Sequence, residues 1–201
     1  MTEPDVTITD FLLAIEALAF AVLIARSSTT TLQRWFVIFF AATALASLAG
    51  ALVHGFFSDS KLLWRLVLIA LGVVSAAGWA IGADLLFTDR TARLVATAAW
   101  VAFAAYAFVV IFVTDTFLVA IVNYLPSTLF LILAFSVHYR AEGETPVLIG
   151  LTGLFLTLVA AAVQQSGIAL HPKYFNHNAL YHVLQAVALF LVFRAFQVLG
   201  P

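Results

Sequence analysis

The chain has 201 residues, of which 64% are hydrophobic and only 9% are charged, and its mean hydropathy is +1.11. A soluble domain carries about 25% charged residues, so this composition excludes a soluble fold. Nine Lys and Arg residues against ten Asp and Glu residues give a formal charge of -1, with no basic surplus for binding nucleic acid. The chain has no cysteine, which excludes disulfides and thiolate metal sites.

The apolar runs predict seven transmembrane helices, because about 20 residues of apolar helix span a bilayer core of roughly 30 Å. Short polar breaks separate the predicted spans, which cover residues 11–25, 35–57, 62–87, 92–113, 117–138, 147–170 and 178–199. Because these breaks are too short to fold alone, consecutive helices are expected to be antiparallel neighbours. The predicted fold is an all-α integral membrane bundle that forms a single domain over residues 1–201.

The basic residues predict the orientation of this bundle. Three of them follow the second and sixth predicted helices, namely Lys61, Arg65 and Lys173. Six lie toward the opposite side, namely Arg26, Arg34, Arg90, Arg93, Arg140 and Arg194. The positive-inside rule then places the N-terminus outside and the C-terminus in the cytoplasm.

Polar side chains within the spans gather in the half that is predicted to be extracytoplasmic. They are Glu16, Ser47, His54, Asn123, Ser127, Gln164, Gln165, Ser166, Asn178, His182 and Gln185. A charge at the centre of a membrane costs about 2.5–3.5 kcal/mol on insertion scales, so such residues need a partner or a function. They predict a polar chamber that opens toward the outside, although Asn and Gln also commonly join neighbouring helices.

Three histidines lie near the outer ends of the second and seventh predicted helices: His54, His177 and His182. Neutral imidazole is a common zinc ligand, and three protein ligands with one open position would activate a bound water. The five-residue spacing between His177 and His182 turns a helix by about 500°. Their rings therefore point apart unless His177 lies in the helix cap.

Two motifs resemble one family of membrane proteins. They are SLAGALVH at residues 47–54 and HNALYH at residues 177–182. The chain resembles the superfamily of alkaline ceramidases, progestin and adiponectin receptors and related lipid hydrolases, whose members hold zinc among seven helices. His54 and His182 match two of the family's zinc ligands, whereas Asn178 stands where the family has a histidine. Gly50 precedes His54 by four residues, at the position of the family's serine.

The resemblance implies a zinc-dependent hydrolase that cleaves an amide or ester bond in a lipid. His54, His182 and either His177 or Asn178 would then hold zinc. The remaining expected roles are proton relay by Glu16 or Asp59, and hydrogen bonding to the oxyanion by Ser47 or Asn123. Residues 175–185, FNHNALYHVLQ, also resemble uncharacterised bacterial membrane proteins near this superfamily, which implies the bacterial inner (plasma) membrane.

Two other functions stay open on the same residues. A non-catalytic binding protein or receptor would use Asn178 and the histidines as hydrogen-bonding groups for a lipid or small ligand, and Asn123 and Gln185 are further candidate ligand-binding residues. A structural accessory subunit would pack its 19 Phe residues against lipid or a partner, and would have no accessible cavity. Membrane lipids are the expected partners, and the small-residue runs at 41–51 and 76–83 also permit a homo-oligomer or a larger membrane complex.

Overall fold

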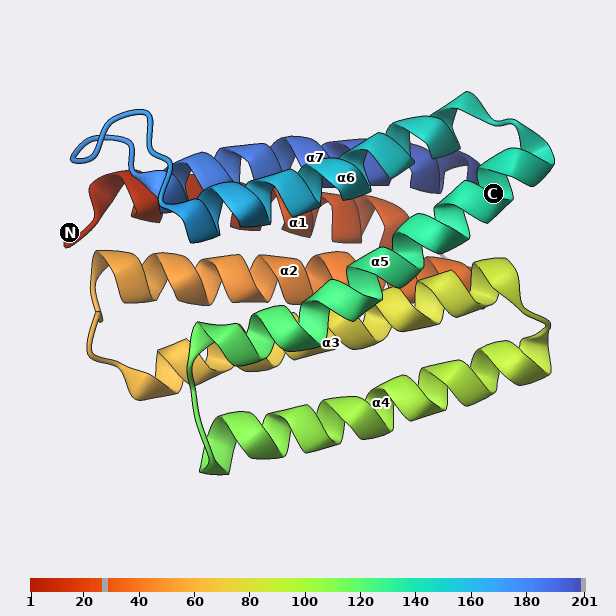
Figure 1. Cartoon of the computed structure of the whole chain (residues 1–201), viewed down its shortest axis with the longest axis horizontal. Helices are drawn as coiled ribbons and strands as arrows, with labels where there is room; N and C mark the ends of the chain where they lie inside the picture. The colour runs from red at the N-terminus through yellow and green to blue at the C-terminus, as the bar shows by residue number, and fades with distance from the viewer. Residues whose placement is uncertain (27–28, 200–201) are drawn as a thin grey trace.

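The computed structural model describes residues 1–26 and 29–199, and within these residues it contains seven α-helices (Figure 1). Their bounds are Pro4–Ala25 (α1), Thr31–Gly55 (α2), Lys61–Leu86 (α3), Asp89–Phe112 (α4), Phe117–Glu142 (α5), Thr145–Ser166 (α6) and His177–Leu199 (α7). Each is long and apolar enough to cross a membrane. This confirms the predicted all-α transmembrane bundle. The single-domain prediction over 1–201 also covers residues 27–28 and 200–201, which lie outside the described residues.

Helix α1 begins at Pro4, seven residues before the predicted start at Phe11. Proline is favourable in the first turn, where its missing N–H would have no helical partner, and Asp5 complements the positive end of the helix dipole. The predicted first span, residues 11–25, left Asp5 and Asp10 outside the helix. The structure corrects this, because both lie within α1, and Asp10 points into the bundle with 4% of its surface exposed.

Six helices form a ring, and α4 lies outside it. In the ring, α1 packs on α2, α2 on α3, α3 on α5, α5 on α6, α6 on α7, and α7 back on α1. Figure 1 shows α4 at the edge of the molecule beside α3. The expectation that consecutive helices are close neighbours is therefore wrong for α4 and α5, which make few contacts with each other.

Small residues on α3 explain how one helix contacts two others. At Gly72, a built Cβ would lie 2.5 Å from the ring of Tyr106 on α4, and the Tyr106 hydroxyl donates a hydrogen bond to the Leu68 carbonyl at 2.9 Å. At Gly78, a built Cβ would lie 2.4 Å from Ser127 Oγ on α5. Both glycines let a partner helix approach closely, so α3 holds α4 and α5 at the same time.

Aromatic packing fills the ring at the end opposite the N-terminus. Phe20 and Phe193 stack with their ring centroids 4.3 Å apart, and Phe40 packs edge-on against Phe20 at 5.4 Å. Phe36 makes a similar edge contact with Phe196 at 5.2 Å. This half of the bundle is a close-packed aromatic core.

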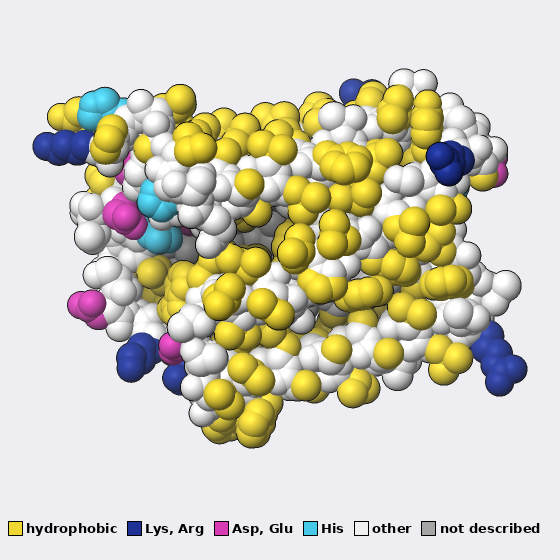
Figure 2. Space-filling model, viewed as in Figure 1, with side chains coloured by type: hydrophobic (Ala, Val, Ile, Leu, Met, Phe, Trp, Pro, Cys, Tyr) yellow, Lys and Arg dark blue, Asp and Glu magenta, His cyan; other side chains and the backbone are white. Residues whose placement is uncertain are grey.

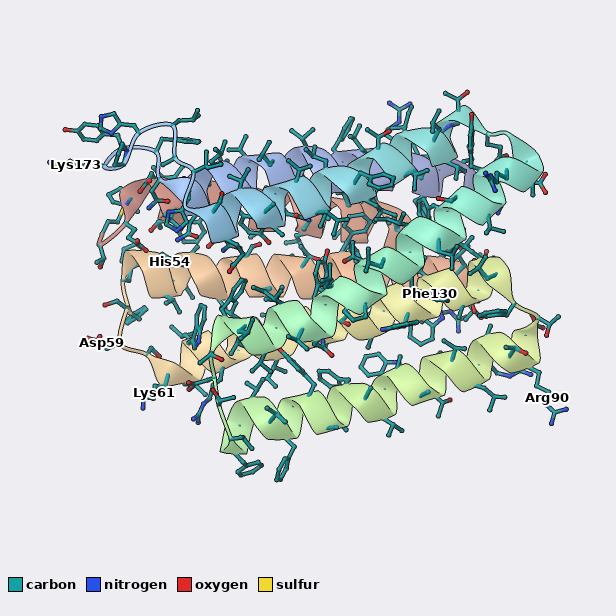
Figure 3. All side chains as sticks on the ribbon, viewed as in Figure 1. His54, Asp59, Lys61, Arg90, Phe130 and Lys173 are labelled. Atoms are coloured by element: carbon teal, nitrogen blue, oxygen red, sulfur yellow. The ribbon has the colours of Figure 1, made fainter. Side chains whose placement is uncertain are left out.

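The outer surface is that of a multi-pass membrane protein. Figure 2 shows hydrophobic side chains over the middle of the visible face, with Lys and Arg at its two ends. Lys61 and Lys173 lie at the same end of the bundle as the N-terminus, and Arg90 lies at the opposite end (Figure 3). The orientation in the bilayer and the bacterial inner membrane stay predictions.

Candidate functional site: a polar-ended cavity inside the ring

A cavity of about 400 Å³ lies inside the ring and is lined by residues of α1, α2, α3, α5, α6 and α7. Among the described residues, none of α4 lines it. Its polar side chains gather near the end where α7 begins, with His54, His177 and Asn178 among them. Its deepest wall is apolar: Leu189 lies about 18 Å along α7 from His177 at 1.5 Å per residue.

The cavity opens sideways between α5 and α6. Leu125 of α5 lines the cavity while 42% of its surface is exposed, and Gln165 of α6 is both exposed and part of the lining. Figure 2 shows the molecular surface hollowed between these two helices. The opening lies among the hydrophobic side chains that lipid tails would cover. In a bilayer, such an opening would face the lipid tails.

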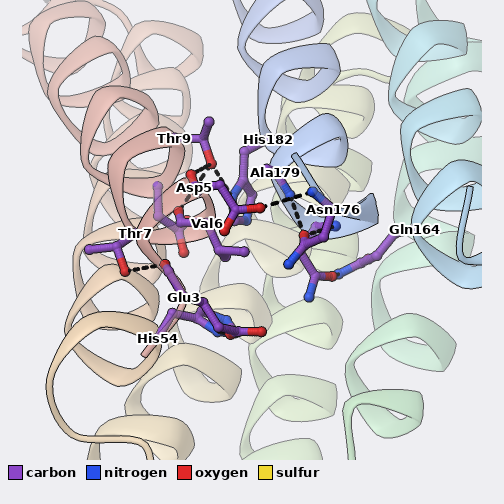
Figure 4. Close-up of polar contacts among 12 residues, drawn as sticks. Glu3, Asp5, Val6, Thr7, Thr9, His54, Gln164, Asn176, Ala179 and His182 are labelled. Carbon is purple, nitrogen blue, oxygen red and sulfur yellow. Dashed lines mark hydrogen bonds and ion pairs between the residues drawn. The ribbon is translucent and has the colours of Figure 1, made fainter. Parts of the chain in front are cut away.

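Asp10 and His182 form a buried acid–histidine pair in the wall of the cavity. Asp10 Oδ1 lies 3.3 Å from His182 Nε2, and the two side chains are 5% and 9% exposed. The other ring nitrogen, Nδ1, lies 3.1 Å from Thr9 Oγ1 on α1 (Figure 4). Both nitrogens of His182 are thus engaged, and the contacts fix α7 against the second turn of α1.

The hydrogen bonds of Thr9 limit the protonation states of this pair. Thr9 Oγ1 lies 2.9 Å from the Asp5 carbonyl and 3.0 Å from the Val6 carbonyl, and when its single proton is donated to either carbonyl the oxygen is left as an acceptor. In that arrangement Oγ1 accepts from a protonated Nδ1 of His182. The contact between His182 Nε2 and Asp10 requires one further proton, held by either group. In both cases the pair has no net charge, which suits its apolar surroundings.

Gly50 of α2 provides the space for the Asp10 carboxyl group. A Cβ built on Gly50 would lie 2.7 Å from Asp10 Oδ2, closer than real side chains approach. The resemblance placed Gly50 where the related proteins have a serine. In this structure the same position accommodates a carboxyl group that comes from α1.

The first residues of the chain join the elements around the mouth of the cavity, which is its polar end, where α7 begins. This mouth is distinct from the lateral opening between α5 and α6. The Glu3 carboxylate contacts His54 Nδ1, and the Glu3 N–H donates to the His54 carbonyl at 3.1 Å. Asp5 Oδ2 accepts a hydrogen bond from the Asn176 N–H at 2.9 Å, at the start of α7. Figure 4 shows these contacts on either side of α1. The N-terminal turn therefore links the end of α2 to the loop before α7.

Two further polar pairs join α6 to α7 along the cavity wall. Gln164 Nε2 lies 3.3 Å from Asn178 Oδ1 near the mouth, and Gln185 Nε2 lies 3.4 Å from Thr157 Oγ1 deeper inside. Gln185 Oε1 has no hydrogen-bond partner among the described residues, and only 6% of the surface of Gln185 is exposed to solvent that could replace one. An unpaired buried amide oxygen costs about 1–3 kcal/mol, so this oxygen is a candidate ligand contact.

The structure brings some of the predicted site residues together. Those that line the same cavity are Ser47, His54, His177, Asn178, His182 and Gln185. The sequence interpretation missed Asp10 because the first helix was predicted to start too late. The spacing of Val6, Asp10, Leu13 and Ala17, all buried on one side of α1, was the signal that would have revealed it.

Three predicted site residues do not line the cavity. Asp59 is exposed on the loop after α2 (Figure 3). Glu16 lies on α1, away from the cavity lining, with a buried Oε2 that has no partner among the described residues. Asn123 contributes its backbone carbonyl to Ser75 Oγ at 2.9 Å, a contact that joins α5 to α3. This arrangement brings none of the three to the Asp10–His182 pair.

The three histidines do not form the expected zinc site. Within the described residues, no group of three His, Cys, Asp or Glu side chains could hold a metal ion. His182 uses both ring nitrogens in contacts with Thr9 and Asp10, and His54 Nδ1 contacts Glu3. The donors therefore do not fit the zinc ion that the resemblance implies. Zinc binding stays a prediction that lacks a ligand set in this arrangement.

The fold and the site define a multi-pass membrane protein with a laterally open, polar-ended cavity. Residues 6–200 match a family described as a family of unknown function, DUF6962, and the chain belongs to this family. No curated protein and no solved structure matches the chain.

Proposed function

We propose that this protein binds an amphipathic lipid, which enters its cavity from the bilayer between α5 and α6. The observation that carries the proposal is the shape and chemistry of the cavity. It has a volume of about 400 Å³, within the range of small-molecule sites, with polar groups near one end and an apolar interior. Such a gradient suits a molecule with one polar and one apolar end.

The cavity also favours a binding role over a purely structural one. A structural subunit would be expected to bury its histidines in mutual contacts and to leave no accessible space. Here His54 and His182 contact separate acidic residues, Glu3 and Asp10, and both histidines line the cavity. These contacts are consistent with walls that are held in place around an open space.

The test fills the cavity with a single side chain. Ala161 of α6 lines the cavity, whereas its neighbour Ala162 is exposed on the outside of the same helix. We expect Ala161→Trp to reduce the lipid that co-purifies with the protein, measured by mass spectrometry after extraction. Ala162→Trp is the matched control and should retain the lipid. Equal retention in both variants, each at wild-type folding yield, would sink the proposal.

A second candidate is hydrolysis of a lipid ester or amide, which the acid–histidine pair favours. In this reaction the Asp10 carboxylate, held by His182, would accept a proton from a water that attacks the acyl carbon of the bound lipid. The bond from that carbon to the ester oxygen or amide nitrogen would then break, and Asp10 would return the proton to the departing alcohol or amine. The test is release of 4-methylumbelliferone from its dodecanoate ester by purified protein in nanodiscs. Asp10→Asn should abolish release while Ala162→Trp retains it. Activity that is unchanged in Asp10→Asn would exclude this role, and activity lost to a chelator would favour the zinc mechanism.

A further inference from the structure

The cavity wall carries neutral hydrogen-bonding groups and three histidines, and the described residues that line it include no Lys or Arg. Arg65, one residue beyond the lining residue Trp64, is paired with Asp115 at 3.2 Å. His54 and His182 are each matched by a carboxyl group. His177, which has no carboxyl contact among the described residues, lies at the end of the cavity about 12 Å along α7 from Gln185. An anionic headgroup at the depth of Gln185 would therefore lose its hydration without gaining a cation, which is costly in an apolar site.

Gln185 is the part of the wall that lacks a partner. Its Nε2 reaches Thr157 Oγ1, but its Oε1 is buried and unpaired among the described residues. The terminal amide turns about a soft torsion, so rotation about it can present Oε1 to a ligand in the cavity that Gln185 and Thr157 both line. A donor on the ligand would satisfy this oxygen and offset the cost of its burial.

The position of Gln185 sets the depth of that donor. Gln185 lies eight residues after His177, about 12 Å along α7 at 1.5 Å per residue. A headgroup that reaches this depth has left the membrane surface and is surrounded by the ring. The apolar wall beyond it includes Phe39, Val74 and Leu189, and Leu189 lies only about 6 Å further along α7. The chain of a lipid whose headgroup lies at this depth would therefore extend toward the opening between α5 and α6.

We propose that the ligand of this cavity is an uncharged amphiphile whose hydroxyl or amide N–H group donates a hydrogen bond to Gln185. This inference rests on the proposed lipid-binding function and specifies its ligand. Long-chain alcohols, monoacylglycerols and fatty amides belong to this class. Fatty acids and anionic phospholipids do not, because the cavity offers their charge no cation at the depth of Gln185, and simple ethers or esters lack the donor.

The experiment compares ligands that share one chain and differ in the headgroup. The protein is placed in lipid nanodiscs, and saturable binding of tritiated 1-dodecanol is measured against empty nanodiscs. Unlabelled dodecanamide, 1-methoxydodecane and dodecanoate then compete. The amide keeps a donor, the ether keeps only an acceptor, and the carboxylate is anionic. We expect dodecanamide to compete well, and the ether and dodecanoate to compete about 10-fold more weakly, as expected for loss of one buried hydrogen bond or burial of an unpaired charge.

Variants at Gln185 test the contact itself. Gln185→Leu should weaken dodecanol binding about 3- to 10-fold and remove the difference between the alcohol and the ether. Gln185→Glu keeps a hydrogen-bond acceptor and should still bind the alcohol more tightly than the ether. This variant tests the contact even if Gln185→Leu folds poorly. The matched control is Gln197→Leu, the same substitution on the same helix, at a side chain that contacts Arg194 outside the cavity.

The outcomes separate the inference from the function on which it rests. Saturable binding in which the ether competes as well as the amide, or dodecanoate competes better, overturns the inference and leaves the lipid-binding function standing. Equal dodecanol affinity in the wild type and Gln185→Leu also overturns it. If none of the four compounds binds saturably to folded protein, the proposed function itself fails.

Discussion

Asp10 and Gly50 show how a missing side chain on one helix makes room for a functional group on another. The Asp10 carboxyl group contacts His182 on α7 and occupies the space beside Gly50 on α2. Three helices therefore meet at one buried acid. Any atom added at Gly50 must displace this acid, and a displaced Asp10 leaves His182 without its charge partner.

This geometry predicts a strong coupling between the two positions. Gly50→Ala should destabilise the protein by about 1–3 kcal/mol, the usual cost of overpacking a core. In an Asp10→Ala background the same substitution should cost nothing, because the clashing atom is gone. Thermal unfolding in detergent, followed by tryptophan fluorescence, measures the stability of the wild type, the two single variants and the double variant. Equal costs in both backgrounds would contradict the placement of Asp10.

At this scale the sequence was informative about residue types but not about partners. His54 and His182 could be identified because a histidine inside an apolar span needs an explanation. Their partners Glu3 and Asp10 were missed, because hydropathy alone set the start of the first helix at residue 11. A polar first turn that continues an apolar span is invisible to a count of apolar residues.

Among the elements, α6 and α7 form the closest pair, and Gly153 lies where they meet. A Cβ on Gly153 would lie 2.6 Å from the Ala188 carbonyl oxygen and 3.1 Å from the Val192 nitrogen. Both are backbone atoms, which cannot rotate away as a side chain does. Small residues at such points let helices in a membrane approach closely.

Adding a methyl group at Gly153 should therefore separate two helices that carry cavity residues. Gly153→Ala is expected to lower stability by about 1–3 kcal/mol and to weaken retention of co-purified lipid. Thr152→Ala, at the exposed neighbouring position, should change stability by less than about 0.5 kcal/mol. Thermal unfolding together with lipid extraction gives both readings. Wild-type values for Gly153→Ala would show that the helices do not pack as described.

The number of helices could be predicted from hydropathy, but their order around the ring could not. Seven apolar runs of spanning length predict seven crossings whatever their neighbours are. The position of α4 depends on Gly72 and Tyr106, and that of α5 on Gly78 and Ser127. Such side-chain fits carry no periodic signal, so short loops suggested a simpler sequential arrangement than the one that forms.

For the whole molecule, the distribution of basic residues at the two ends predicts the orientation in the bilayer. The end with the N-terminus carries Lys61 and Lys173, and the opposite end carries Arg90 among its six arginines. The absence of cysteine makes the orientation easy to test, because each introduced thiol is the only reactive one in the chain.

We expect Ser58→Cys, on the loop after α2, to react with a membrane-impermeant maleimide on intact cells. Thr88→Cys, at the other end of α3, should react only after the cells are permeabilised, since the positive-inside rule places that end in the cytoplasm. Both positions are exposed, so accessibility within the fold is matched. The reverse labelling pattern would invert the proposed orientation and place the mouth of the cavity at the cytoplasmic side.

The position of α4 outside the ring has a consequence for the tolerance of the chain to mutation. Of the described residues, those of α4 that face away from α3 contact neither the cavity nor the aromatic core, and side chains such as Leu94, Val101 and Phe108 are more than half exposed. The fold of the chain itself asks of these side chains only that they be apolar enough to face lipid. In a library of all single substitutions, α4 should accept apolar exchanges on this outer face freely, while Tyr106 and its surroundings resist them.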